Sequence, residues 1–179
     1  MFYNSNATNE SASVRVRTFK DSSVTTWDVV LYGIPYTTQG KEVTANWISL
    51  DINNDNTFYT DSSALEMQKR VFDYRPTWDL YTEEHVSGNY YPVNSAIAIV
   101  EKTKALQMTV MNDRSQAGSV IKNGRIELLM NRRLYYDDSR GVNEPLNETD
   151  SYGNGITVPA TYHLELIDRS ASVSSQRFI

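Results

Sequence analysis

The chain has no cysteine among its 179 residues. This absence excludes disulfide frameworks, zinc sites built on thiolates and cysteine nucleophiles. Long apolar runs are also lacking, so no segment is expected to cross a bilayer, and residues 1–20 have no apolar signal-peptide core. Cationic residues are too few to balance the acidic ones. The net charge of −5 therefore argues against nucleic acid or an anionic membrane as a partner, because both attract cationic surfaces.

Histidine is scarce as well. His85 and His163 are far apart in the sequence, so a zinc site would need carboxylates around one or both of them. We interpret each as a solvent-facing or hydrogen-bonded side chain. Neither lies in a serine-nucleophile motif, and no glycine-rich loop for phosphate is present. The residues therefore predict no metal site and no serine–histidine catalysis.

The segment DINNDNTFYTDS, residues 51–62, imitates a calcium-binding loop. Asn56 stands where that loop requires a glycine, and Ser62 stands where it requires a bidentate glutamate. We interpret the segment as a strand-to-strand turn that is capped by its own side chains.

Alternation of apolar and polar residues with a period of two indicates β-strands. In SVRVRTF, for example, Val14 and Val16 alternate with Arg15 and Arg17. Strands are also predicted within residues 25–35, 41–52, 95–101, 105–113, 124–134 and 160–168. The segment 63–71 fits a short helix or a strand. The chain is predicted to be all-β, a single antiparallel β-sandwich over residues 1–179 with loose ends at 1–12 and 169–179.

The densest group of charges is NRRLYYDDSRGVNEP, residues 131–145. A carboxylate pair for glycoside hydrolysis is one interpretation. However, neighbouring aspartates on an extended chain point in opposite directions, so Asp137 and Asp138 do not easily flank one bond. The alternative is a turn in which arginine side chains hold carboxylates. Composition alone favours the turn.

Three sequons for N-glycosylation occur, at Asn6, Asn9 and Asn147. All three lie in polar, loop-like segments. They favour a protein of the secretory-pathway lumen whose signal lies outside this chain.

Four ordered blocks resemble the C-terminal β region of lysosomal-type α-mannosidases, glycoside hydrolase family 38. They are IPYTTQGKEV (34–43), FYTDSSALEMQKRVFDYRPTW (58–78), VSGNYYPVNSAIAI (86–99) and the segment 113–148, which contains DRSQAGSVIKNGRIELLMNRRLYYDDSRG. The resemblance covers most of residues 25–168. It implies a large β-sandwich of the galactose-mutarotase-like supersandwich type, as part of a larger multidomain enzyme.

The resemblance also implies where the chemistry lies. Family members are retaining exo-α-mannosidases whose zinc ion and aspartate nucleophile belong to an N-terminal catalytic domain upstream of this region. The chain is thus expected to be a non-catalytic part with no cofactor of its own, in the lysosome or the secretory-pathway lumen. Its expected partners are the catalytic chain or domain and a mannose-containing glycan. A stand-alone carbohydrate-binding or structural sandwich, with sugar stacking on Tyr90, Tyr91, Tyr135 or Tyr136, is the alternative.

One contact to substrate is implied within this chain. In the family, the turn that matches DDSRG reaches the catalytic pocket and offers a backbone carbonyl, here that of Arg140. The residues expected to support that loop are Arg132, Arg133, Asp137, Asp138 and Gly141.

The chain departs from the family at two glycines. Ser63 and Ala64 stand where a glycine usually follows FYTDSN, and Ala117 replaces the first glycine of DRSQGG. A lost glycine puts a positive-φ turn in doubt. We expect local rearrangement at both points without a change of fold.

Overall fold

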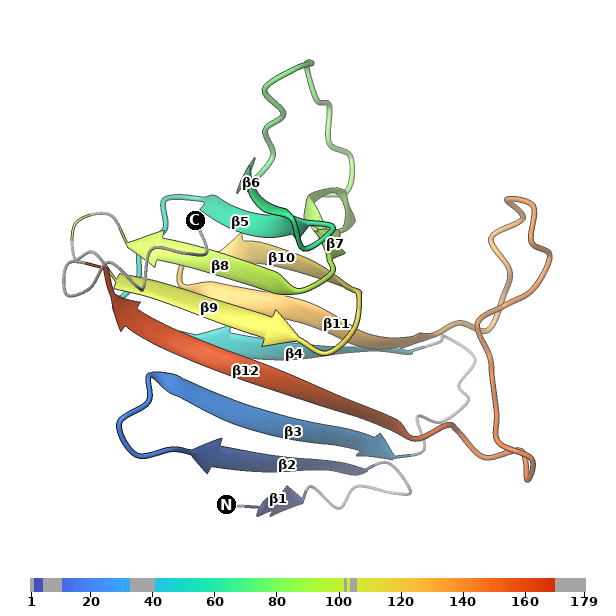
Figure 1. Ribbon diagram of the computed structural model, residues 1–179. Coiled ribbons are helices and arrows are strands. Elements are labelled where there is room, and N and C mark those ends of the chain that lie inside the picture. The colour runs from blue at the N-terminus through green and yellow to red at the C-terminus, as the bar shows by residue number, and fades with distance from the viewer. Residues whose placement is uncertain (1, 5–10, 33–40, 102, 104–105, 170–179) are drawn as a thin grey trace.

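The computed structural model describes residues 2–4, 11–32, 41–101, 103 and 106–169. In this part of the chain, β-strands form two sheets and the one helix is the 3-10 turn η1 (Ser87–Asn89). All strand pairings are antiparallel. The prediction of an all-β antiparallel sandwich is therefore confirmed (Figure 1).

The larger sheet has eight strands in the order β1-β2-β3-β12-β9-β8-β5-β6. Its strands are β1 (Phe2–Asn4), β2 (Ser11–Thr18), β3 (Val24–Tyr32), β5 (Thr57–Ser62), β6 (Glu66–Val71), β8 (Ala96–Glu101), β9 (Leu106–Asn112) and β12 (Val158–Asp168).

The smaller sheet has four strands in the order β4-β11-β10-β7. They are β4 (Lys41–Ile48), β7 (Tyr91–Val93), β10 (Gln116–Lys122) and β11 (Arg125–Arg133). In Figure 1 the strands β4, β11 and β10 lie behind β12, β9 and β8, whereas β3, β2 and β1 extend below them with no described strand behind.

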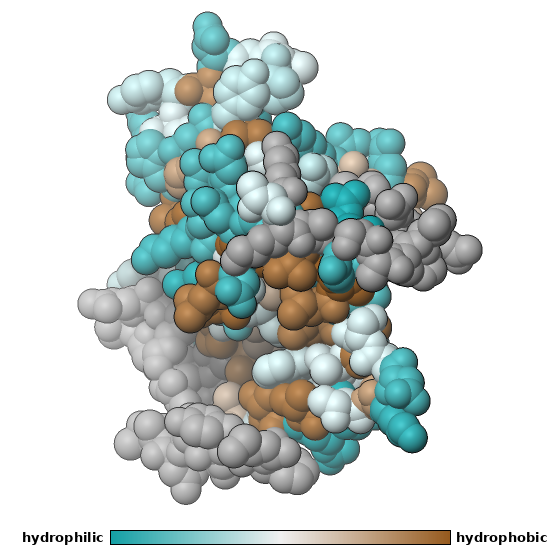
Figure 2. Space-filling view, turned by 90° about the vertical axis from the view of Figure 1, so that its left-hand side faces the viewer, coloured by the Kyte–Doolittle hydropathy of each residue, from teal (hydrophilic) through white to brown (hydrophobic). Residues whose placement is uncertain are grey.

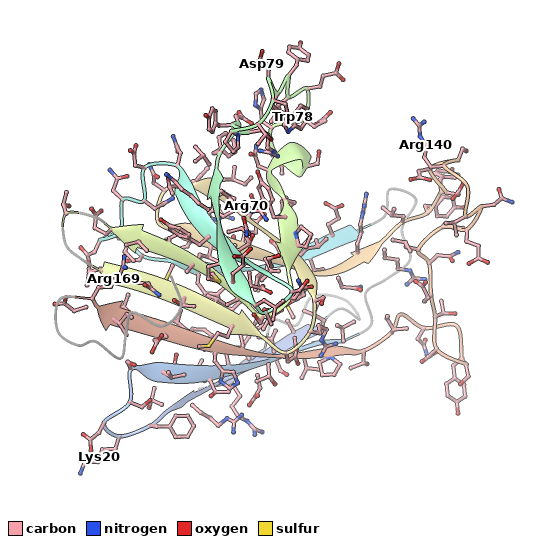
Figure 3. The ribbon with its side chains drawn as sticks, turned by 45° about the horizontal axis from the view of Figure 1, so that its top comes forward. Lys20, Arg70, Trp78, Asp79, Arg140 and Arg169 are labelled. Carbon is pink, nitrogen blue, oxygen red and sulfur yellow. The ribbon has the colours of Figure 1, made fainter. Side chains whose placement is uncertain are left out.

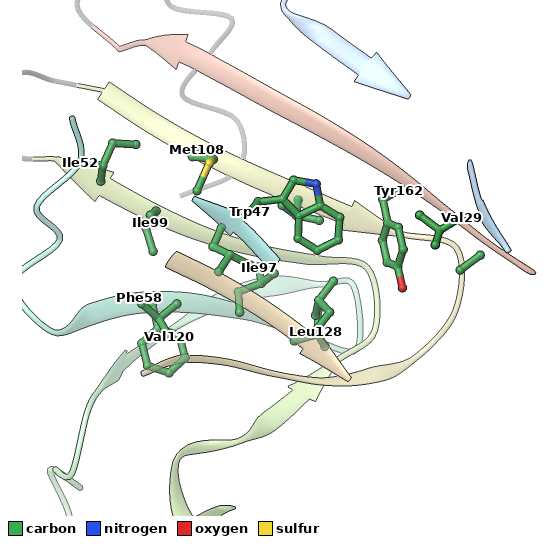
Figure 4. Packing of buried hydrophobic residues seen from close by; sticks show 14 residues of the cluster. Val29, Trp47, Ile52, Phe58, Ile97, Ile99, Met108, Val120, Leu128 and Tyr162 are labelled. Atoms are coloured by element: carbon green, nitrogen blue, oxygen red, sulfur yellow. The ribbon is translucent and has the colours of Figure 1, made fainter. Parts of the chain in front are cut away.

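The core lies between the two sheets where they overlap (Figure 4). Trp47 of β4 meets Tyr162 of β12 edge to face, with ring centroids 4.8 Å apart. Gly118 of β10 is required for close packing, because a Cβ there would lie 2.7 Å from a methyl of Val93 and 2.8 Å from one of Leu128. Further buried members are Ile52, Phe58, Ile97, Ile99, Met108, Val110, Val120 and Ile126.

Most predicted strands occur close to their expected positions. The sequence pattern missed β5, β7 and β10, and it left residues 63–71 undecided, where the structure has β6. The loose N-terminal end is wrong in part, because Phe2–Asn4 form β1 and pair with β2. Most of the expected C-terminal tail lies outside the described residues.

The first half of the calcium-like segment, residues 51–56, is a turn as predicted, whereas its second half is the strand β5 (Thr57–Ser62), so that part of the prediction is wrong. Asn54 donates from its amide to the Thr57 carbonyl at 2.8 Å and accepts from the Gly124 N–H at 2.8 Å. The Asp55 N–H donates to Asn53 Oδ1 at 3.1 Å. Side-chain amides thus cap this turn and join it to the β10–β11 hairpin.

The two glycine departures have different outcomes. Ser63 and Ala64 keep positive φ angles of 52° and 58°, and the Leu65 N–H closes the turn on the Ser62 carbonyl at 2.9 Å. The positive-φ turn is therefore kept without glycine, because the tight hairpin holds two L-residues in the left-handed region. Ala117 lies in the extended strand β10, paired with Leu129 and Pro92, so no positive-φ turn exists there to be lost.

The carboxylate of Asp61 joins the β5–β6 hairpin to the segment between β7 and β8. It is buried, and its Oδ1 accepts the N–H groups of Asn94, Ser95 and Ala96 at 2.7, 2.9 and 3.1 Å. Its Oδ2 accepts the Ala64 N–H at 2.8 Å. Burial acts to raise the pKa of Asp61, but the four backbone donors outweigh it and hold this pKa below its usual value.

The left-handed turn predicts opposite effects for two Ala→Gly substitutions. Ala64→Gly should raise the free energy of unfolding by about 0.5–1 kcal/mol, since glycine adopts positive φ without steric cost. Ala117→Gly, in a regular strand, should lower it by about 0.5–1 kcal/mol. Urea denaturation of both variants measures the difference, and destabilisation by Ala64→Gly would contradict the turn geometry.

Asp61→Asn should destabilise the protein by about 2–4 kcal/mol at pH 7, because the amide keeps one acceptor and sets its NH₂ against backbone donors. Since folding lowers the pKa of Asp61, its stabilisation is complete above the unfolded pKa of about 3.9 and is lost as pH falls through the folded pKa. The stability gap between wild type and variant should therefore narrow between pH 5 and pH 2 in urea melts, at roughly the pH values where carboxylates titrate. Asp79→Asn, at an exposed loop position, is the matched control and should leave the free energy of unfolding at pH 7 unchanged.

Candidate functional site

Residues 134–157 connect β11 to β12 and project away from both sheets (Figure 1). We call this segment the β11–β12 arm. It contains most of the charged motif singled out in the sequence. At its base, the Leu134 N–H donates to the Leu146 carbonyl at 2.8 Å, which draws the two sides of the arm together.

The two arginines at the end of β11 contact the base of the arm and the neighbouring strand. The Arg132 Nε lies 2.9 Å from Glu42 Oε1 of β4, in a half-exposed ion pair. Arg133 is buried, and its Nη2 donates to the Asn147 carbonyl at 3.4 Å. The expected pairing of these arginines with the adjacent aspartates is therefore wrong: Arg132 pairs with another strand, and Arg133 bonds backbone in the arm.

Asp137 and Asp138 bind the arm's own backbone. The Ser139 N–H donates to Asp137 Oδ2 at 2.7 Å, and the Arg140 N–H donates to Asp138 Oδ1 at 3.0 Å. These are two consecutive Asx turns. The aspartates thus hold the loop locally, by a hydrogen bond each, instead of through arginine forks.

Arg140 lies at the end of the arm, with its side chain in solvent (Figure 3). Gly141 follows with φ +123°, an angle that only glycine adopts without strain, and a Cβ there would have no neighbour within 4 Å. Ser139 and Asn143 also have positive φ, at 59° and 64°. The chain therefore turns sharply on both sides of the Arg140 carbonyl.

The other half of the arm is held by Asp150. Its Oδ1 accepts the N–H groups of Tyr152 and Asn154 at 2.9 and 2.8 Å. These bonds, first that from the Asn154 N–H, lower the pKa of the Asp150 carboxyl. The sequon residue Asn147 is exposed in the same half, while Asn6 and Asn9 lie outside the described residues.

The arm presents large apolar side chains to solvent. Tyr136, Val142 and Tyr152 are 72%, 78% and 88% exposed. Tyr135 packs edge to face against Tyr136, with ring centroids 4.5 Å apart. Apolar side chains concentrated on one projecting segment are typical of a surface that another protein or domain covers.

The two histidines are placed much as expected. His163 is exposed and its Nδ1 lies 3.1 Å from Thr26 Oγ1. His85 is exposed too, but its Nδ1 lies 2.5 Å from Asp73 Oδ2, a contact the sequence pattern did not predict. Asn89 completes this network by donating to Asp73 Oδ1 at 2.6 Å. The described residues contain no group of three or more His, Cys, Asp or Glu side chains able to hold a metal ion.

The sequence model of the glycosyl hydrolases family 38 C-terminal domain matches residues 10–140. The chain belongs to this family. Lysosomal α-mannosidases of Bos taurus and Homo sapiens are 44% identical to it over 137 and 138 residues, which is 76% and 77% of this chain but 13% of each relative. The relative from Dictyostelium discoideum is 40% identical over 110 residues.

A solved α-mannosidase from Enterococcus faecalis shares the fold of this family 38 chain. The TM-score is 0.60 over 88% of this chain and 16% of the other, at 14% identity. At that identity the likeness concerns the fold alone. In the part of the chain that is described, no helix is long and apolar enough to cross a membrane.

The Asx turns predict how the arm responds to substitution. Asp138→Ala should speed amide exchange of Arg140 about fivefold, because one hydrogen bond of about 1 kcal/mol is lost. Asp138→Asn keeps the acceptor oxygen and should exchange like wild type. If the carboxylate acted through an arginine pair, both variants would loosen the arm equally in an NMR exchange measurement.

Proposed function

We propose that this chain is the non-catalytic β-domain part of a lysosomal-type retaining α-mannosidase. The full assembly would remove terminal α-D-mannose from N-glycan oligosaccharides. In it, this part completes the substrate pocket through the Arg140 carbonyl and stabilises the catalytic domain.

The share of the relatives' length that the chain covers supports a non-catalytic role beside a separate catalytic domain. The chain spans 13% of the bovine and human lysosomal α-mannosidases. The family resemblance assigns zinc and the nucleophile to a domain upstream of the matched region. The partner is therefore the catalytic chain or domain, and the ligand of the assembly is a mannose-containing glycan.

The geometry of the β11–β12 arm is the observation that carries the proposal. A backbone carbonyl is a useful sugar contact only if its loop is held in place, because a shift of about 1 Å can cost on the order of a hundredfold in rate. The Asx turns of Asp137 and Asp138 and the bonds at the base of the arm supply that restraint. Its exposed apolar side chains supply a surface for the catalytic domain to cover.

The lysosome is the proposed location. The relatives of Bos taurus, Homo sapiens and Dictyostelium discoideum are named lysosomal. The exposed Asn147 sequon is compatible with glycosylation in the lumen of the secretory pathway.

A stand-alone carbohydrate-binding sandwich fits the structure less well. Tyr90 donates its hydroxyl to Glu127, and burial together with this bond raises the pKa of Tyr90. The Tyr91 ring is stacked by the guanidinium groups of Arg70 and Arg75, 4.4 and 4.8 Å from its centroid. The hydroxyl of Tyr90 and the ring of Tyr91 are thus engaged within the protein. If a titration of the chain alone with a glycan gave a dissociation constant below millimolar, that result would favour the carbohydrate-binding sandwich.

The purified chain should not hydrolyse an aryl α-mannoside, with or without added zinc. A chimera of the bovine enzyme, in which this chain replaces the similar segment, should hydrolyse it. Zinc-dependent turnover by the chain alone would overturn the proposal.

Within that chimera, two neighbouring substitutions separate a backbone contact from a side-chain contact. Gly141→Ala should lower kcat/KM by about tenfold or more, because alanine resists φ +123° and displaces the Arg140 carbonyl. Arg140→Ala leaves the carbonyl in place and should change kcat/KM less than twofold or so. The reverse ranking would show that the contact is made by the arginine side chain.

A further inference from the structure

The outer edge of β4 is a long edge of the smaller sheet that no described strand pairs with. The register of β4 against β11 shows which backbone groups face that edge. The Ser49 N–H donates to the Gly124 carbonyl at 2.8 Å, so the backbone groups of Ser49 point toward β11. Since the N–H and C=O groups of successive residues point to alternate sides of a strand, the backbone groups of Thr44, Asn46 and Ile48 point away from β11.

The hydrogen bonds on the other side of β11, toward β10, agree with this assignment. The Leu129 carbonyl of β11 accepts the Gln116 side chain of β10, so it faces away from β4. Leu129 is the register partner of Thr44, which places this pair in a position without mutual hydrogen bonds. The backbone groups of Thr44 therefore point outward.

Below this edge, the larger sheet continues as a wing formed by β3, β2 and β1. Val14 and Trp27 on its inner face are partly buried and pack against the core cluster. On the same face, Leu164 is partly buried, and Leu166 at the end of β12 is 51% exposed. Figure 2, which views the side where β3 begins and β12 ends, shows hydrophobic side chains at the surface between the upper and lower parts.

The remaining sheet edges are protected in the ways that natural proteins use. The edges at β1 and β7 are three residues long, and Pro92 lies within β7. The edge at β6 has Glu66, Lys69 and Arg70. By contrast, the charges of β4 are confined to its first two residues, Lys41 and Glu42, and the stretch Val43–Ile48 contains neither proline nor charge.

We propose that β4 is a docking edge for a β-strand from the rest of the mannosidase polypeptide. The added strand pairs with the free groups of Thr44, Asn46 and Ile48 and lays alternate apolar side chains on Trp27 and Val14. The wing has room for it, since three strands span about 14 Å at the usual spacing. The identity of the donor rests on the proposed function, whereas the open edge rests on the sheet geometry alone.

A second copy of this chain does not fit the edge. Antiparallel pairing of β4 with its symmetry mate places the twofold axis perpendicular to the sheets, so both large sheets lie in one layer. Each wing extends beyond β4, and the two wings would occupy the same space. A strand without such a wing avoids this clash, and most of the length of the relatives lies outside the present chain.

Amide hydrogen exchange, resolved by residue, tests the edge in the isolated chain and in the bovine chimera. The amides of Thr44, Asn46 and Ile48 should exchange freely in the isolated chain and about 100-fold more slowly in the chimera. Those of Ala45 and Trp47, which face β11, should be slow in both proteins and serve as internal controls. Equal exchange of the outward amides in the two proteins, whether fast or slow, would overturn the proposal.

A proline pair provides an independent test. Thr44→Pro removes an outward N–H, so the isolated chain should keep its wild-type thermal transition, while the chimera should lose protection at Asn46 and Ile48. Ala45→Pro removes an N–H bonded to β11 and should unfold the isolated chain. Retained protection in the Thr44→Pro chimera would overturn the docking edge. Mannosidase activity of the unsubstituted chimera reports separately on the proposed function. If the amides at the β4 edge were protected in a chimera without activity, the proposed function would be wrong and the docking edge would stand.

Discussion

The contact between Trp47 and Tyr162 lies near the border between the covered and the open parts of the large sheet. Tyr162 is the residue of β12 that pairs with Trp27 of β3 on one side and with Asn112 of β9 on the other. On the β9 side, the inner face is closed by the smaller sheet and its side chains are fully buried. On the β3 side, the same face continues without a described strand above it. The described part of the chain has eight strands in the larger sheet and four in the smaller one, so the smaller sheet covers only part of the larger. Both the position of the core and the open edge of β4 follow from this difference in size.

Polar groups inside such a sandwich must find partners, and Asp61 satisfies four backbone donors at once. Its carboxylate fixes the β5–β6 hairpin relative to the start of β8, two segments more than thirty residues apart. A buried acceptor of this kind contributes specificity as well as stability, because an alternative packing would leave the N–H groups unpaired. The left-handed turn at Ser63 and Ala64 is held against its own steric cost by one of these bonds.

The same principle explains why a segment dense in acids and bases is not arranged as a catalytic centre. A carboxylate oxygen of each of Asp137, Asp138 and Asp150 accepts hydrogen bonds from nearby backbone N–H groups. In a loop that projects into water, such N–H groups otherwise bond to solvent. Arg133 serves the base of the arm from a buried position. Charge in the arm therefore shapes the backbone around Arg140, and the proposed contact with sugar is made by a carbonyl.

The sequence by itself determined the class of fold, since strands such as β2 alternate apolar and polar residues, and the partly buried Val14 and Val16 alternate with the exposed Arg15 and Arg17 in the structure. It also determined the family, through blocks of ordered motifs, and the turn at residues 51–56, through its amide side chains. It could not predict β7 or β10, because short or glycine-containing strands depend on neighbours for their pairing. Nor could it predict that Asp61 reaches Asn94, that His85 meets Asp73, or that Arg132 pairs with Glu42. Those contacts join residues distant in the chain, and only the tertiary structure decides which distant residues meet, because alternation specifies the face of a strand but not its neighbours.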